Sequence, residues 1–86
     1  MYYVYLLKSK KDNKLYVGLT NDLKKRFTEH NRGLSRSTMY RRPLTLIYYE
    51  AYLSTKDAQI REKKLKKFKN SYAKLKKRTI NSLEEK

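Results

Sequence analysis

The stretch from Tyr2 to Thr20, YYVYLLKSKKDNKLYVGLT, decides the fold. Residues 2–8 and 15–20 are rich in aromatic and β-branched side chains, which favours two strands. The polar segment 9–14 between them contains an Asp-Asn pair, a typical turn signal. A link this short predicts that the two strands form an antiparallel hairpin.

Three side chains of this hairpin are expected on one face of the sheet. If Tyr5 lies opposite Tyr16, both phenols point to the same side, as cross-strand partners do. Gly18 follows Tyr16 by two residues and therefore faces the same way. A glycine inside a strand indicates that another backbone or a ligand approaches closely.

A helix is predicted after the hairpin. Asn21 or Asp22 can cap its start, and it runs to about Arg32, where Gly33 ends it. Its buried stripe, at near-helical spacing, is expected to comprise Leu23, Phe27 and Leu34.

Arg26 and His30 lie one turn apart beside this stripe. Their spacing predicts that both sit at the boundary between core and solvent. An arginine held there can grip a phosphate in two places. A histidine there could donate a proton near neutral pH.

The remaining chain predicts a basic loop, a third strand and two more helices. Residues 34–43 form the loop, and the apolar run 44–53 forms the strand. Ser54 and Asp57 resemble a capping box that opens a helix over 55–69, and Ser71 is expected to cap a last helix. Inward positions on these helices are expected to be Ala58, Arg61 (by its stem), Leu65, Phe68, Tyr72, Leu75 and Ile80.

The order of elements is therefore β-β-α-β-α-α. This predicts one α+β domain over residues 1–86, with helices flanking a three-stranded antiparallel sheet. Residues 82–86 are expected to be a frayed tail. A chain of 86 residues buries only about 60–65% of its unfolded surface, so a site is expected on a shallow face.

The net charge points to a polyanionic partner. Lys and Arg number 23 against 8 acids, which gives a formal charge of +15. Nucleic acid fits this surplus best, and an anionic membrane surface is the competitor. No apolar run approaches the ~20 residues that a membrane span requires, and the strand-like start of the chain leads us to expect no signal peptide.

The residue inventory narrows the possible metal chemistry. The chain has no cysteine and one histidine, which excludes disulfides, thiolate zinc sites and multi-histidine centres and indicates a cytoplasmic protein. A catalytic metal would need oxygen ligands, which favours Mg²⁺ or Mn²⁺.

Glu62 is the best candidate for a metal-binding carboxylate. It follows Ala58 by one turn, near the inward helix face and among lysines, so it should stay ionised. A surface pair with Lys66, worth a few tenths of a kcal/mol, is the simpler interpretation. Glu50, in the third strand, is the rival candidate, whereas the other acids lie in turns, caps or the tail.

Taken in order, these residues resemble the GIY-YIG nuclease superfamily over nearly the whole chain. Tyr3-Val4-Tyr5 stands for the first motif, with Tyr3 in place of its glycine, and Tyr16-Val17-Gly18 differs from the second by one conservative change. Arg26, His30 and Glu62 follow in the family's order. The segment from Ala58 to Lys66 is similar to a compact, single-domain bacterial subfamily of uncharacterised proteins. Many members carry a later asparagine, and Asn70 is the candidate here, although it comes early.

The resemblance implies hydrolysis of phosphodiester bonds at one metal ion. It implies that Glu62 holds Mg²⁺ or Mn²⁺, that Tyr5 or Tyr16 orients or deprotonates the attacking water, and that Arg26 offsets charge on the phosphate. His30 would assist at the phosphate or the leaving group. Basic side chains expected to grip the nucleic-acid backbone are Lys24, Lys25, Arg36, Arg41, Arg42, Lys66 and Lys69.

DNA is favoured over RNA as the substrate, in a structure-selective repair or processing role or together with a protein partner. A sequence-specific enzyme is disfavoured because 86 residues leave no room for a recognition module. The main alternative is a nucleic-acid-binding module with the same fold and little catalytic power. A third is a basic ribosome- or RNA-associated protein, which would leave the tyrosine spacing to chance.

Overall fold

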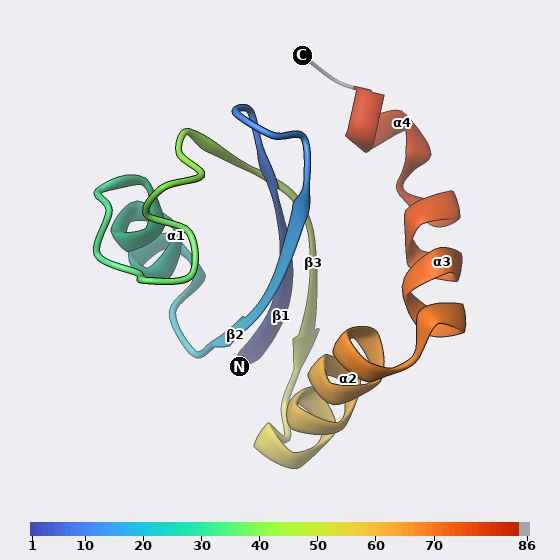
Figure 1. Cartoon of the computed structure of the whole chain (residues 1–86). Helices are drawn as coiled ribbons and strands as arrows, with labels where there is room; N and C mark the ends of the chain where they lie inside the picture. Colours follow the sequence, from blue (N-terminus) through green and yellow to red (C-terminus); the bar gives the residue numbers. More distant parts are fainter. Residues whose placement is uncertain (85–86) are drawn as a thin grey trace.

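A three-stranded antiparallel sheet, ordered β2-β1-β3, forms the centre of the computed structural model, which describes residues 1–84 (Figure 1). The strands are β1 (Tyr2–Ser9), β2 (Leu15–Thr20) and β3 (Leu44–Tyr52). Their bounds agree with the predicted strands to within one residue. The α+β class and the antiparallel sheet are thus confirmed.

The register of the hairpin differs from the expected one. Tyr5 pairs with Gly18, and Leu7 pairs with Tyr16, so the two tyrosines do not lie directly opposite each other. The difference is two residues, and side chains alternate between faces with a period of two. Tyr5 and Tyr16 therefore still share one face, as diagonal neighbours.

Helices cover both faces of the sheet (Figure 1). Helix α1 (Leu23–Asn31) lies on one side, while α2 (Thr55–Lys67) and α3 (Lys69–Arg78) lie on the other. A short α4 (Ile80–Glu84) follows α3. Among the helices of residues 1–84, none is both long enough and apolar enough to cross a membrane.

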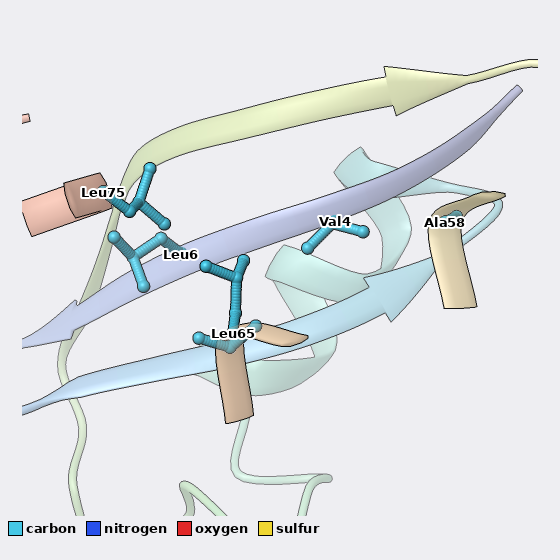
Figure 2. Packing of buried hydrophobic residues seen from close by; sticks show 6 residues of the cluster. Val4, Leu6, Ala58, Leu65 and Leu75 are labelled. Carbon is cyan, nitrogen blue, oxygen red and sulfur yellow. The ribbon is translucent and has the colours of Figure 1, made fainter. Parts of the chain in front are cut away.

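Each face of β1 builds its own core because its four central residues are all buried. Val4 and Leu6 pack with Ala58, Leu65 and Leu75 from α2 and α3 (Figure 2). On the opposite face the core contains Tyr5, Leu7 and Leu44, backed by Tyr16, Leu23, Phe27 and Leu46. This second face carries the candidate site.

The ends of α1 are fixed by the predicted residues. Asp22 caps the start, and its carboxylate accepts a hydrogen bond from the Lys25 amide at 3.1 Å. At the other end Gly33 has φ +78°, and the amides of Gly33 and Leu34 donate to the carbonyls of His30 and Glu29. This paired arrangement reverses the chain abruptly. Leu34 is consequently 63% exposed, and its predicted place in the buried stripe is wrong.

Several expectations for the last helices are also wrong. The break falls at Phe68, whose extended backbone (φ −108°, ψ 110°) separates α2 from α3, rather than at Ser71, which lies inside α3. Phe68 and Ile80 are 58% and 52% exposed instead of inward. Ser54 occupies the N-cap of α2, but within residues 1–84 its side chain makes no cap hydrogen bond. Of the predicted tail, 82–84 belong to α4 and 85–86 lie outside the described residues.

Candidate active site

The ring of Tyr5 lies directly over Gly18. Tyr5 is 2% exposed, and a Cβ atom added at Gly18 would overlap the phenol ring of Tyr5. The close approach expected at this glycine therefore comes from a tyrosine ring rather than from a backbone or a ligand. Gly18 is needed because any side chain there would displace Tyr5.

A buried chain of hydrogen bonds holds the Tyr5 hydroxyl. It lies 2.8 Å from Nε2 of His30, and Nδ1 of His30 lies 2.7 Å from the Thr38 hydroxyl. A neutral imidazole has one donor and one acceptor, so His30 donates to one of the two hydroxyls and accepts from the other. Thr38 comes from the loop that Gly33 turns back over α1.

The position of His30 corrects the prediction that it lies at the boundary of core and solvent. Its side chain is 0% exposed, and both ring nitrogens are engaged. Burial, together with the nearby positive charge of Arg26, lowers the pKa of His30 to about 4. His30 is therefore neutral at pH 7, and this geometry suits it to positioning Tyr5 rather than to touching a phosphate.

Tyr16 is the more accessible of the two tyrosines. Its ring centroid lies 6.4 Å from that of Tyr5 and 5.2 Å from that of His30, and it is only partly buried. Burial and the neighbouring Tyr16 raise the pKa of Tyr5 to about 12, and Arg26 opposes this only in part. Tyr5 therefore remains protonated at neutral pH, although Arg26 lowers its pKa.

Arg26 lies at the border of core and solvent, as predicted. Its side chain is 33% exposed, and it forms an ion pair with Glu29 at 3.2 Å. Burial alone would lower the pKa of its guanidinium, but interactions with Tyr5 and Glu29 outweigh burial and raise it. Arg26 thus presents a fixed positive charge beside Tyr5.

Glu62 reaches this region from the opposite side of the sheet. It lies on α2, which contacts β2, the edge strand that carries Tyr16. Lys66 links the two elements, since its Nζ is 3.3 Å from Glu62 and 6.0 Å from the centre of the Tyr16 ring. Glu62 is also near enough for its charge to raise the pKa of Tyr5. At the β2 edge, Lys66 therefore lies near both the Tyr16 ring and the Glu62 carboxylate.

Glu50, the rival carboxylate, is fully engaged elsewhere. It pairs with Arg61 at 2.9 Å and accepts hydrogen bonds from the hydroxyls of Tyr48 and Tyr52. These contacts lie on the face that α2 and α3 cover. Burial would raise the pKa of Glu50, but Arg61 and the two tyrosines outweigh it and lower the pKa. Glu50 is a structural ion, and Glu62 remains the metal candidate.

A metal ion would have few protein ligands at this site. Within residues 1–84, no three His, Cys, Asp or Glu side chains are grouped closely enough to hold one. Glu62 has 22% of its side chain exposed and one surface partner, Lys66. A single accessible carboxylate fits Mg²⁺ or Mn²⁺, because these ions keep several waters and can take the remaining oxygens from substrate phosphate.

The side chains predicted to bind phosphate differ in how far they are already engaged by other residues. Arg41 pairs with Asp12 at 3.2 Å, Arg42 donates to the Met39 carbonyl, and Lys66 pairs with Glu62. All of these residues except Arg41 are exposed, namely Lys24, Lys25, Arg36, Arg42, Lys66 and Lys69. Asn70 is exposed in the first turn of α3, and no hydrogen bond or ion pair among residues 1–84 joins it to Tyr5 or Tyr16.

Two residues of the site were missed in the sequence. Thr38 completes the hydrogen-bond chain, and Ser35 lies 3.4 Å from Arg26. Both are buried, although the sequence of their loop is basic and polar and does not indicate burial. A polar loop directly after a Gly-terminated helix is the only signal that could have found them.

Known proteins resemble this chain in sequence and in structure. UPF0213 protein CPE1444 of Clostridium perfringens (strain 13 / Type A) is 46% identical over 68 residues, which cover 78% of this chain and 72% of that protein. UPF0213 protein SpyM50708 of Streptococcus pyogenes serotype M5 (strain Manfredo) is 43% identical over 74 residues, covering 85% and 79%.

A solution NMR structure, that of the UPF0213 protein BH0048 from Bacillus halodurans, is similar with a TM-score of 0.56 and 31% identity. It covers 87% of this chain, and this chain covers 82% of it. The model of the GIY-YIG catalytic domain matches residues 1–78. The chain therefore belongs to the GIY-YIG family, as its two tyrosine motifs predict.

Proposed function

We propose that this protein is a metal-dependent endonuclease that hydrolyses phosphodiester bonds in DNA. The observation that carries this proposal is the position of Lys66, whose Nζ lies 3.3 Å from Glu62 and 6.0 Å from the centre of the Tyr16 ring at one edge of the sheet. Membership of the GIY-YIG family supports the same chemistry.

The tyrosines have different parts in the proposed reaction. Tyr16 is partly accessible and orients the attacking water or accepts its proton. Tyr5 is buried, with its pKa raised to about 12, so it serves to position Tyr16 and Arg26. Arg26 offsets the negative charge that develops on the phosphate.

Glu62 is the residue proposed to hold one Mg²⁺ or Mn²⁺ ion. When bound, such an ion polarises the phosphate and stabilises the leaving oxygen. Lys66 would have to release Glu62, and its ammonium group would then be free to bind a neighbouring phosphate. Lys66 thereby couples binding of the metal to binding of the substrate phosphate.

The proposed substrate is DNA with a particular shape, in repair or processing, or DNA selected by a protein partner. Exposed lysines and arginines bind phosphates without reading the bases, and the formal charge of +15 suits such binding. Selection of the DNA substrate would then depend on its branch or flap, or on the protein partner.

A catalytically weak binding module with this fold is the second candidate. The ion pair between Lys66 and Glu62 favours it, because the carboxylate is already neutralised. The neutral, buried His30 favours it as well, since it cannot act as an acid near pH 7. Cleavage assays separate the two candidates.

The test compares cleavage and binding by wild type and two carboxylate variants. Branched, flap and linear DNA and RNA are incubated with Mg²⁺, Mn²⁺ or a chelator. Glu62→Gln should abolish cleavage yet bind DNA as well or slightly more tightly, because a negative charge leaves a positive surface. Asp57→Asn, which changes an exposed acid on the same helix, should retain cleavage. A Glu62→Gln protein that cuts as fast as wild type would exclude Glu62 as the ligand, and an inert wild type would favour the binding module.

A further inference from the structure

A pocket lies on the same face of the sheet as Tyr5, on the side towards β3. This pocket has a volume of about 530 Å³, within the usual range for small-ligand sites. Its apolar walls come from β1, β3 and α1, and its polar rim comes from the start of α1. The lining residues are Tyr3, Asn21, Asp22, Leu23, Lys24, Phe27, Leu46 and Tyr49.

Two tyrosines form an aromatic wall of this pocket. Tyr3 and Tyr49 meet edge to face, with ring centroids 5.9 Å apart and planes at 69°. Tyr49 is 53% exposed although it pairs directly with the buried Tyr5. Tyr3 stands where the first GIY-YIG motif has glycine, so this chain adds an aromatic ring beside the catalytic motif. Folding does not require two large rings facing an open pocket.

The rim of the pocket suits a nucleotide. Lys24 lines it and is exposed, and Lys25 is its exposed neighbour, so a phosphate can be neutralised there. Asn21 offers an exposed amide that can donate to and accept from a base edge. The one acid, Asp22, is held by its cap hydrogen bond to Lys25. Aromatic and apolar walls under a cationic rim match an unpaired base and its phosphate.

We propose that this pocket binds an unpaired nucleotide of single-stranded nucleic acid, with its base against Tyr3 and Tyr49 and its phosphate near Lys24. The inference rests on the proposed nucleic-acid function but not on cleavage. It also accounts for selection of shape, because a flap or branch offers an unpaired base and a blunt duplex does not.

The experiment measures binding in a chelator, so that cleavage plays no part. The probe is a DNA flap with 2-aminopurine, a fluorescent base, in its unpaired arm, and a blunt duplex of equal charge is the reference. Wild type should quench the fluorescence and prefer the flap. Tyr49→Thr, which keeps a strand-forming residue, should abolish quenching and reduce flap affinity by about 5- to 100-fold while leaving duplex affinity unchanged.

Three further variants separate stacking from other effects. Tyr49→Phe keeps the ring and should behave as wild type, whereas Tyr3→Thr should resemble Tyr49→Thr. Tyr40→Ala removes a tyrosine that is 77% exposed outside the pocket and should leave quenching intact. Wild-type quenching by folded Tyr49→Thr, or an equal loss of flap and duplex affinity, would overturn the proposal. If wild type cleaves DNA but does not quench 2-aminopurine, the pocket proposal is wrong and the proposed nuclease function stands.

Discussion

Acid should destabilise this protein through His30, the one histidine of the chain. An unfolded histidine takes up a proton near pH 6.5, whereas burial and Arg26 delay protonation of the folded one to about pH 4. Between these values the unfolded state binds more protons, so the free energy of unfolding falls as the pH falls.

The size of the effect follows from the difference between the two pKa values. Each pH unit in this window costs about 1.4 kcal/mol. The expected loss is therefore about 2 kcal/mol by pH 5 and about 3 kcal/mol by pH 4, relative to pH 7. That is a large share of the stability of a small domain.

Two measurements test this reasoning. Urea unfolding between pH 7 and pH 5 should show the loss as a falling urea midpoint in wild type. In His30→Gln the midpoint should change much less with pH, because most carboxylates remain ionised over this pH range. Proton NMR can follow the ring of this single histidine directly in folded and urea-unfolded protein. A folded His30 that titrates near pH 6.5 would refute both the buried chain and its role in positioning Tyr5.

Three other perturbations test different parts of the structure. Gly18→Ala should cost about 1–3 kcal/mol by forcing the Tyr5 ring aside, measured by urea unfolding; a variant as stable as wild type would contradict the close contact. Glu50→Gln should cost about 2 kcal/mol in the same assay because Arg61 loses its anionic partner, and an unchanged midpoint would show that the pair is weak. DNA affinity should fall by about 0.9 log units per neutralised phosphate for each tenfold rise in salt, and salt-independent binding would argue against a grip on the backbone.

Strand and helix positions could be predicted because local patterns determine them. Alternating and apolar runs locate the strands, and Asp22 and Gly33 mark both ends of α1. The shared face of Tyr5 and Tyr16 was correctly predicted despite the wrong register, because a shift of two residues preserves the face. The exact register depends on the turn, where Asn13 adopts φ 60°, and this is not visible in the sequence.

The burial of His30 could not be predicted from its own helix. A loop that comes later in the chain covers it, and the Thr38 hydroxyl satisfies its second nitrogen. Phe68 was expected inward because a helix was assumed to continue through it, whereas its extended backbone breaks the spacing. Both errors arise from tertiary contacts and chain reversals, which helical periodicity does not report.

The covering of the sheet from both sides has a consequence during protein synthesis. Glu62 follows Tyr5 by 57 residues, which takes roughly 3–11 s to translate. Until α2 emerges and covers Val4 and Leu6 with Ala58 and Leu65, the chain has its tyrosines and Arg26 but lacks Glu62. A nascent chain that is attached to a ribosome, itself rich in RNA, would thus hold the basic half of the proposed nuclease without its proposed metal ligand. The order of translation delays the proposed activity until the domain is complete.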